Sequence, residues 1–126
     1  MQNREIIRHG ECLLIPITEL PNGSVVIKNT KEVIVAHSES GHNHIAVADE
    51  ITSYSFNAES VKSKLSNTLF GHADISGLIY LGSNGFVTHQ KTFDQHETKP
   101  LTKGFYVIVQ KNAYNYFRKL QERVVD

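Results

Sequence analysis

Short apolar runs rich in valine and isoleucine recur along this chain, separated by proline, glycine and asparagine, and they limit the folds open to it. Such runs, bounded by turn residues, are typical of β-strands. We expect strands at residues 11–17, 24–28, 32–37, 44–48, 51–57, 78–81, 86–88 and 105–110. About eight short strands predict a mainly β fold, an antiparallel sandwich or small barrel, rather than alternating strands and helices.

Turn residues suggest how these strands are joined. Pro21 and Gly23 follow the first predicted strand, where a turn favours them. The segment 29–31 separates two β-branched runs and predicts a hairpin, and the Gly-Ser-Asn-Gly segment at 82–85 predicts a second one. The opening residues 1–8 are interpreted as an arm or an edge strand.

Two stretches change from the strand period to a helical one. Between residues 58 and 70, apolar residues recur at four-residue spacing, which favours a short helix or an excursion from the sheet. An apolar stripe over residues 113–124 predicts a C-terminal amphipathic helix, formed by Ala113, Phe117, Leu120, Gln121 and Val124.

Length and charge narrow the class of protein. With 126 residues the chain is expected to form a single β-rich domain over 1–126. It has 13 basic and 13 acidic residues, so we expect no bulk attraction to nucleic acid or to an anionic membrane. The longest apolar runs are far shorter than the roughly 20 residues that span a bilayer, and no signal peptide is evident. We expect a cytoplasmic or virion-associated protein that is not secreted by a signal peptide.

The histidines are the main candidates for a function. In an extended strand His42 and His44 share a face, as two ligands of one metal ion would. His89 and His96 are the further candidate ligands, and His37 also lies beside a predicted strand. Neutral imidazole suits zinc, nickel, iron and manganese, so a divalent transition metal is the expected cofactor.

Another interpretation of these histidines stays open. A single His-x-His in a small domain is more often a pair of surface or turn histidines than a pair of ligands. His9 and His72 are interpreted as solvated or hydrogen-bonding loop residues. Glu50 is either an ordinary solvated acid or a carboxylate that serves the metal site, and the single cysteine, Cys12, is expected to be a buried thiol because it lies in an apolar run.

Several short motifs resemble an uncharacterised family of small bacterial and phage-encoded proteins. They are His9-Gly10-Glu11 with Leu13-Leu14-Ile15-Pro16, then Ser40-Gly41-His42-Asn43-His44, Thr88-His89, and Pro100-Leu101 with Gly104 and Tyr106. The resemblance supports the histidine candidates and implies a bacterial or phage source. It implies no activity.

Two functions from different classes follow. The first is a β-rich structural or binding module, a phage virion or accessory protein, that has a histidine cluster and acts with protein partners or a second copy of itself. The alternative is a metal-dependent enzyme of the cupin type, in which His-x-His, Glu50 and a distant histidine form the metal site. No phosphate loop or nucleophile elbow is present, so nucleophilic catalysis is not expected.

Overall fold

The computed structural model describes residues 5–9, 12–36, 43–65, 75–89 and 98–110. Within them the chain is mainly β and forms one antiparallel sheet of eight strands, as predicted. The strands are β1 (Ile7–His9), β2 (Cys12–Ile17), β3 (Val25–Ala36), β4 (His44–Ser55), β5 (Ile75–Leu81), β6 (Gly85–His89), β7 (Lys99–Leu101) and β8 (Gly104–Val109). The helix predicted at 113–124 lies outside the described residues.

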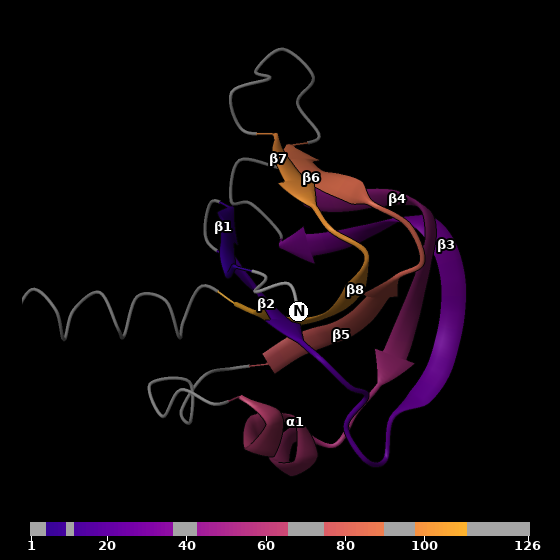
Figure 1. Ribbon diagram of the computed structural model, residues 1–126, viewed down its shortest axis with the longest axis vertical. Helices are drawn as coiled ribbons and strands as arrows, with labels where there is room; N and C mark the ends of the chain where they lie inside the picture. The colour runs from indigo at the N-terminus through magenta and orange to yellow at the C-terminus, as the bar shows by residue number, and fades with distance from the viewer. Residues whose placement is uncertain (1–4, 10–11, 37–42, 66–74, 90–97, 111–126) are drawn as a thin grey trace, which may run out of the picture.

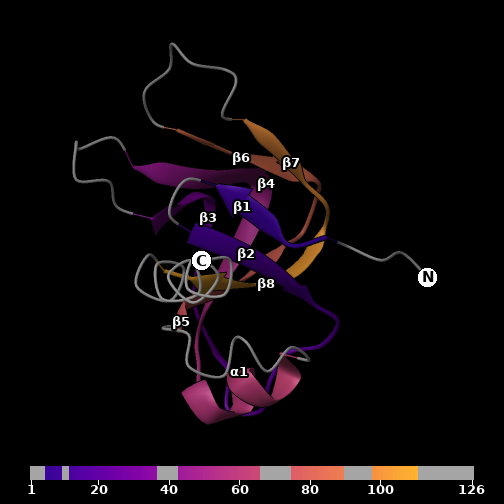
Figure 2. The same ribbon diagram turned by 90° about the vertical axis from the view of Figure 1, so that its left-hand side faces the viewer.

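The sheet curls into a nearly closed barrel. Its strands follow the order β1-β2-β8-β5-β4-β6-β7, and β3 pairs with β4 off this path. The two ends of the order meet where Lys99 Nζ of β7 donates a hydrogen bond of 2.6 Å to Arg8 O of β1. Figures 1 and 2 show how the strands wrap around a common interior. Of the two architectures predicted, the barrel is therefore the one observed.

The hairpin predicted around residues 29–31 is wrong, because β3 runs through this segment as one strand. Its polar side chains are accommodated in the sheet, since Asn29 Oδ1 accepts a 2.6 Å hydrogen bond from Thr52 Oγ1 of β4. The two strands predicted at 44–48 and 51–57 are likewise one strand, β4. A turn-like sequence can thus remain extended when the neighbouring strand supplies its hydrogen bonds.

The hairpin predicted at 82–85 is also wrong. Among the described pairings β5 and β6 do not join each other, and both pair in succession with β4, where Leu81 lies opposite Ile51 and Phe86 opposite Val47. The glycine-rich segment between them is therefore a bend. Gly85 is required there because a Cβ on it would lie 2.0 Å from Val47 O.

Strand β7 lies in the polar stretch 90–103, where no strand was predicted. Three residues are too few to show a strand period. Leu101 of β7 is nevertheless buried, and the turn into β8 is closed by Tyr106, whose hydroxyl donates to Thr102 O at 2.9 Å.

Alternate residues of the strands fill two apolar clusters on opposite faces of the sheet. On β2, Leu14 belongs to the larger cluster, whereas Ile15 and Ile17 belong to the second one. The short helix α1 (Ala58–Lys64) contributes Val61, which is fully buried, to this second cluster. The sheet therefore has apolar contacts on both faces, one of which is covered by α1.

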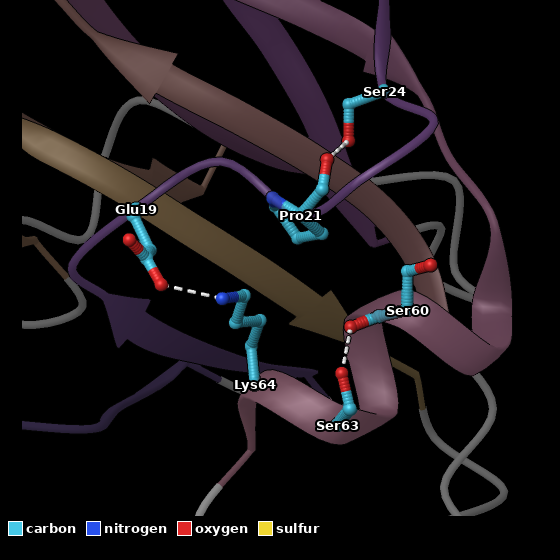
Figure 3. A network of polar contacts seen from close by, with 6 residues as sticks. All are labelled: Glu19, Pro21, Ser24, Ser60, Ser63 and Lys64. Carbon is cyan, nitrogen blue, oxygen red and sulfur yellow. Dashed lines mark hydrogen bonds and ion pairs between the residues drawn. The ribbon is translucent and has the colours of Figure 1, made fainter.

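Helix α1 confirms the beginning of the helix predicted at 58–70, and its ends explain its length. Asn57 Oδ1 caps the first turn by accepting from Glu59 N and Ser60 N at 2.9 and 3.2 Å. The helix ends at Lys64, and the backbone of the C-cap residue Leu65 is extended. An ion pair from Lys64 to Glu19 joins the last turn to the loop after β2 (Figure 3), but it is exposed and contributes little. None of the helices in the described ranges could cross a bilayer.

Candidate functional site

Two buried histidines contact each other in this barrel although 35 residues separate them in the chain. His9 is 1% exposed and His44 is 6% exposed. Their Nδ1 atoms are 2.6 Å apart, and the rings meet edge to face at 81° with centroids 4.7 Å apart. We call His9 and His44 the histidine pair.

Strand geometry explains how the pair forms. His9 is the last residue of β1, where it faces inward next to the exposed Arg8 and pairs in register with Cys12 of β2. His44 is the first residue of β4 and has two register partners, Ala36 on β3 and His89 on β6. The histidine pair therefore connects the edge strand β1 with the strand around which the sheet is built.

The surroundings of the pair are apolar. Cys12, Ala36 and Ala46, which are neighbours of the two histidines in sequence or in register, belong to the larger buried cluster. In the part of the chain that the structure describes, no charged or amide side chain is buried, and His9 and His44 are the only buried histidines. Burying a polar ring costs free energy unless its nitrogens are satisfied, so the contact between them has a stabilising role.

The geometry of the pair is compatible with two kinds of chemistry. If one Nδ1 carries a proton, it donates a hydrogen bond to the lone pair of the other Nδ1. If neither carries one, the two Nδ1 lone pairs can bind one metal ion. Bonds of about 2.0–2.1 Å to a tetrahedral ion would hold the two nitrogens about 3.3 Å apart, so the rings need to separate by only about 0.7 Å.

Cys12 lies beside the pair, but its chemistry differs from that of a ligand. Its Sγ donates a hydrogen bond to His9 O at 3.3 Å. Burial raises the pKa of the Cys12 thiol to about 12, so the sulfur stays protonated at neutral pH. A nucleophile or a metal ligand needs the thiolate. The prediction of a buried thiol is confirmed.

The structure locates the predicted metal ligands only in part. His44 is in the histidine pair, and the backbone of His89 lies opposite it on β6. The side chain of His89 and the whole of His37, His42 and His96 lie outside what the structure describes. Among the described side chains no three from histidine, cysteine, aspartate and glutamate are grouped to hold an ion. The four-histidine site stays a prediction.

Two other predicted positions can be compared with the structure. Glu50 is exposed on β4 beside Gly82, and no metal group of the described residues includes it. The interpretation of His9 as a loop residue is wrong, because it is buried in β1. The following Gly10 suggested the end of any regular structure, and a strand of three residues is too short to be detected from its pattern.

The described residues define a small antiparallel β-barrel domain with a buried pair of histidines. The chain belongs to the family described as "Domain of unknown function (DUF8820)", whose family model matches residues 8–111 and so includes every strand except the first residue of β1. Neither a curated protein nor a solved structure gives a significant match to the chain. The family description adds no activity, so the chemistry of the site has to carry the functional argument.

Proposed function

We propose that this protein is a binding module that holds a divalent transition-metal ion, such as zinc, nickel, iron or manganese, at the histidine pair. The observation that carries the proposal is the 2.6 Å approach of His9 Nδ1 to His44 Nδ1 inside an apolar cluster. Imidazole is the commonest metal ligand of proteins, and two buried ring nitrogens this close to each other can supply two of the four ligands of a tetrahedral site.

With His9 and His44 as the first two ligands, a tetrahedral site needs two more, and three further histidines are the candidates. His89 is the best candidate because its backbone pairs in register with His44. His42 precedes His44 by two positions, a spacing that places two residues on one face of an extended chain. His96 is retained from the sequence pattern alone.

Such an ion would have a mainly structural effect. The ion would link β1 to β4, and through His89 it would also link β4 to β6. Strands from three regions of the sequence would then bind the same ion. Metal binding to a site that exists only in the folded state stabilises the fold by mass action. The burial of both described ligands supports a binding role in preference to the cupin-type enzyme.

The proposal is tested by thermal melts of untagged, chelator-treated protein with and without added zinc, nickel, iron(II) or manganese. At a hundred times the dissociation constant the ion should add about 2.7 kcal/mol to the free energy of unfolding, a rise in Tm on the order of 10 °C. His9→Gln and His44→Gln should each remove most of this rise, because each deletes one of the converging nitrogens.

His72→Gln is the matched control, because this histidine is not a proposed ligand. Its metal-induced rise in Tm should equal that of the wild type. The proposal fails if none of the four metals raises the Tm, or if His44→Gln retains the full rise. The histidine pair would then be a buried hydrogen bond that fixes β1 on the sheet.

A further inference from the structure

An open groove of about 570 Å³ lies where residues of β3, β4, β5 and β8 come together. Its volume is within the range of small-molecule sites, roughly 300–1,000 Å³, and such sites often lie at the mouths of β-barrels. Part of its lining consists of residues two apart on neighbouring strands, which share one face of the sheet. They are Ser53 and Ser55 on β4, Gly77 and Ile79 on β5, and Ile108 with Gln110 at the end of β8.

The lining of the groove is apolar and uncharged. Isoleucine, leucine, valine and aromatic side chains line it together with serines and one glutamine, and none of the described lining residues carries a charge. A charged molecule would give up water there without gaining an ion pair, which costs free energy. The lining therefore favours a neutral ligand with a mainly apolar body.

One hydrogen-bond acceptor in the lining is held in place. Gln110 Nε2 donates to Val35 O of β3 at 3.0 Å and to Ser76 Oγ of β5 at 2.9 Å. These two bonds use both hydrogens of the amide, so Gln110 Oε1 is left as an acceptor. An acceptor that is already fixed loses little conformational entropy when a ligand donates to it.

A second polar group in the lining is Ser53, whose hydroxyl is buried. Among the described side chains, Ser53 Oγ is the only buried nitrogen or oxygen without a hydrogen-bond partner. Its register neighbour on β5 is the apolar Ile79, which offers none. A buried hydroxyl without a partner costs free energy. Because a serine hydroxyl can turn between rotamers, it can form a hydrogen bond with a polar group of a ligand that fills the groove.

We propose that this groove binds a small neutral molecule that has an apolar body and one hydrogen-bond donor, an N–H or O–H group. The donor bonds to Gln110 Oε1, the apolar body contacts the aliphatic side chains of β3 and β5, and the Ser53 hydroxyl provides a further polar contact. The groove and the histidine pair share no residue, so this proposal does not depend on the metal site.

Two fluorescent probes test the ligand class on the full chain. Phenylnaphthylamine is neutral, has one N–H donor and fluoresces strongly in apolar surroundings. Anilinonaphthalene sulfonate has the same aromatic body with an added negative charge. Fluorescence titration should show saturable binding of the neutral probe at one site, and the sulfonate should bind about tenfold more weakly. The N-methylated neutral probe, which lacks the donor, should bind about fivefold more weakly than its parent.

A charge placed in the lining tests the location of the site. Ile34 lines the groove and is 45% exposed, so Ile34→Lys should leave the fold intact. This variant should bind the sulfonate several-fold more tightly than the wild type does, and the neutral probe more weakly. Val26→Lys is the matched control, because Val26 is 56% exposed on the same strand and does not line the groove. It should leave both affinities unchanged.

Four outcomes would overturn the proposal. They are the absence of saturable binding of the neutral probe, equal binding of its sulfonated analogue, equal binding of the N-methylated probe, and a response to Ile34→Lys no larger than the response to Val26→Lys. The first three need no variant, so they test the wild-type protein directly.

Discussion

Burial moves the ionisation of Cys12 out of the range in which thiols usually react. Its side chain is 1% exposed, and desolvation raises its pKa from 9.0 to about 12. An unfolded chain exposes the same thiol to water, where it ionises near 9.0. The folded state therefore favours the protonated form, and this contribution to stability is complete below pH 9 and declines as the pH rises from 9 towards 12.

We predict that Cys12 resists iodoacetamide at pH 8.5 in the folded protein and reacts once the protein is unfolded in urea. The folded thiolate fraction should be about a thousandfold lower, as the difference in pKa implies. Above pH 9, the urea-derived free energy of unfolding should fall more steeply in the wild type than in Cys12→Ala. Rapid alkylation of folded protein would show that the thiol is accessible.

At the scale of elements, the bend between β5 and β6 depends on one glycine. A Cβ at Gly85 would lie 2.0 Å from Val47 O and 2.8 Å from the Cβ of Ala48, so neither contact can be relieved by rotating a side chain. Gly85→Ala should lower the free energy of unfolding by about 3 kcal/mol, at the upper end of overpacking effects. Urea denaturation measures the change.

Gly82→Ala in the same bend is the control. Its added Cβ would meet Glu50 at 3.5 Å or more, which is ordinary van der Waals contact. The stability of this variant should stay close to that of the wild type. If both alanine variants lose the same stability, the cost arises from the flexibility of glycine in the bend and not from the close approach of β4.

Helix α1 should depend strongly on its cap, because a helix of seven residues has few internal hydrogen bonds. Asn57→Ala should cost about 1 kcal/mol, since Glu59 N and Ser60 N lose their acceptor. Asn57→Asp should retain the stability because aspartate caps equally well. Urea titrations of the three proteins distinguish a capping effect from a general effect of changing this residue.

The elements show which features a sequence pattern can predict. β2 and β8 were predicted within one or two residues because each is a continuous apolar run. The segment 29–31 was misread as a turn because its extended form depends on Thr52, which is 23 residues from Asn29. His44 was predicted as a site residue from the His-x-His spacing. Its contact with His9 was not predicted, because the residues around His44 in the sequence give no signal of which distant strand end lies beside it in the fold.

At the scale of the whole molecule, a sandwich or small barrel could be predicted from the many short strands and the turn residues between them. The order of the strands in the sheet could not. The path β2-β8-β5-β4 joins distant parts of the chain, and only hydrophobic packing across the finished sheet selects it.

The pairing of β2 with β8 has a consequence for synthesis of the protein. Leu13 lies opposite Val109, so β2 is synthesised nearly a hundred residues before the strand with which it pairs. Its hydrogen bonds to β8 can form only after that strand has left the ribosome. During that time its apolar residues, and those of β5, lack their neighbour in the sheet. Translation speed and chaperone access should therefore influence the yield of folded protein more than they would in a chain of consecutive hairpins.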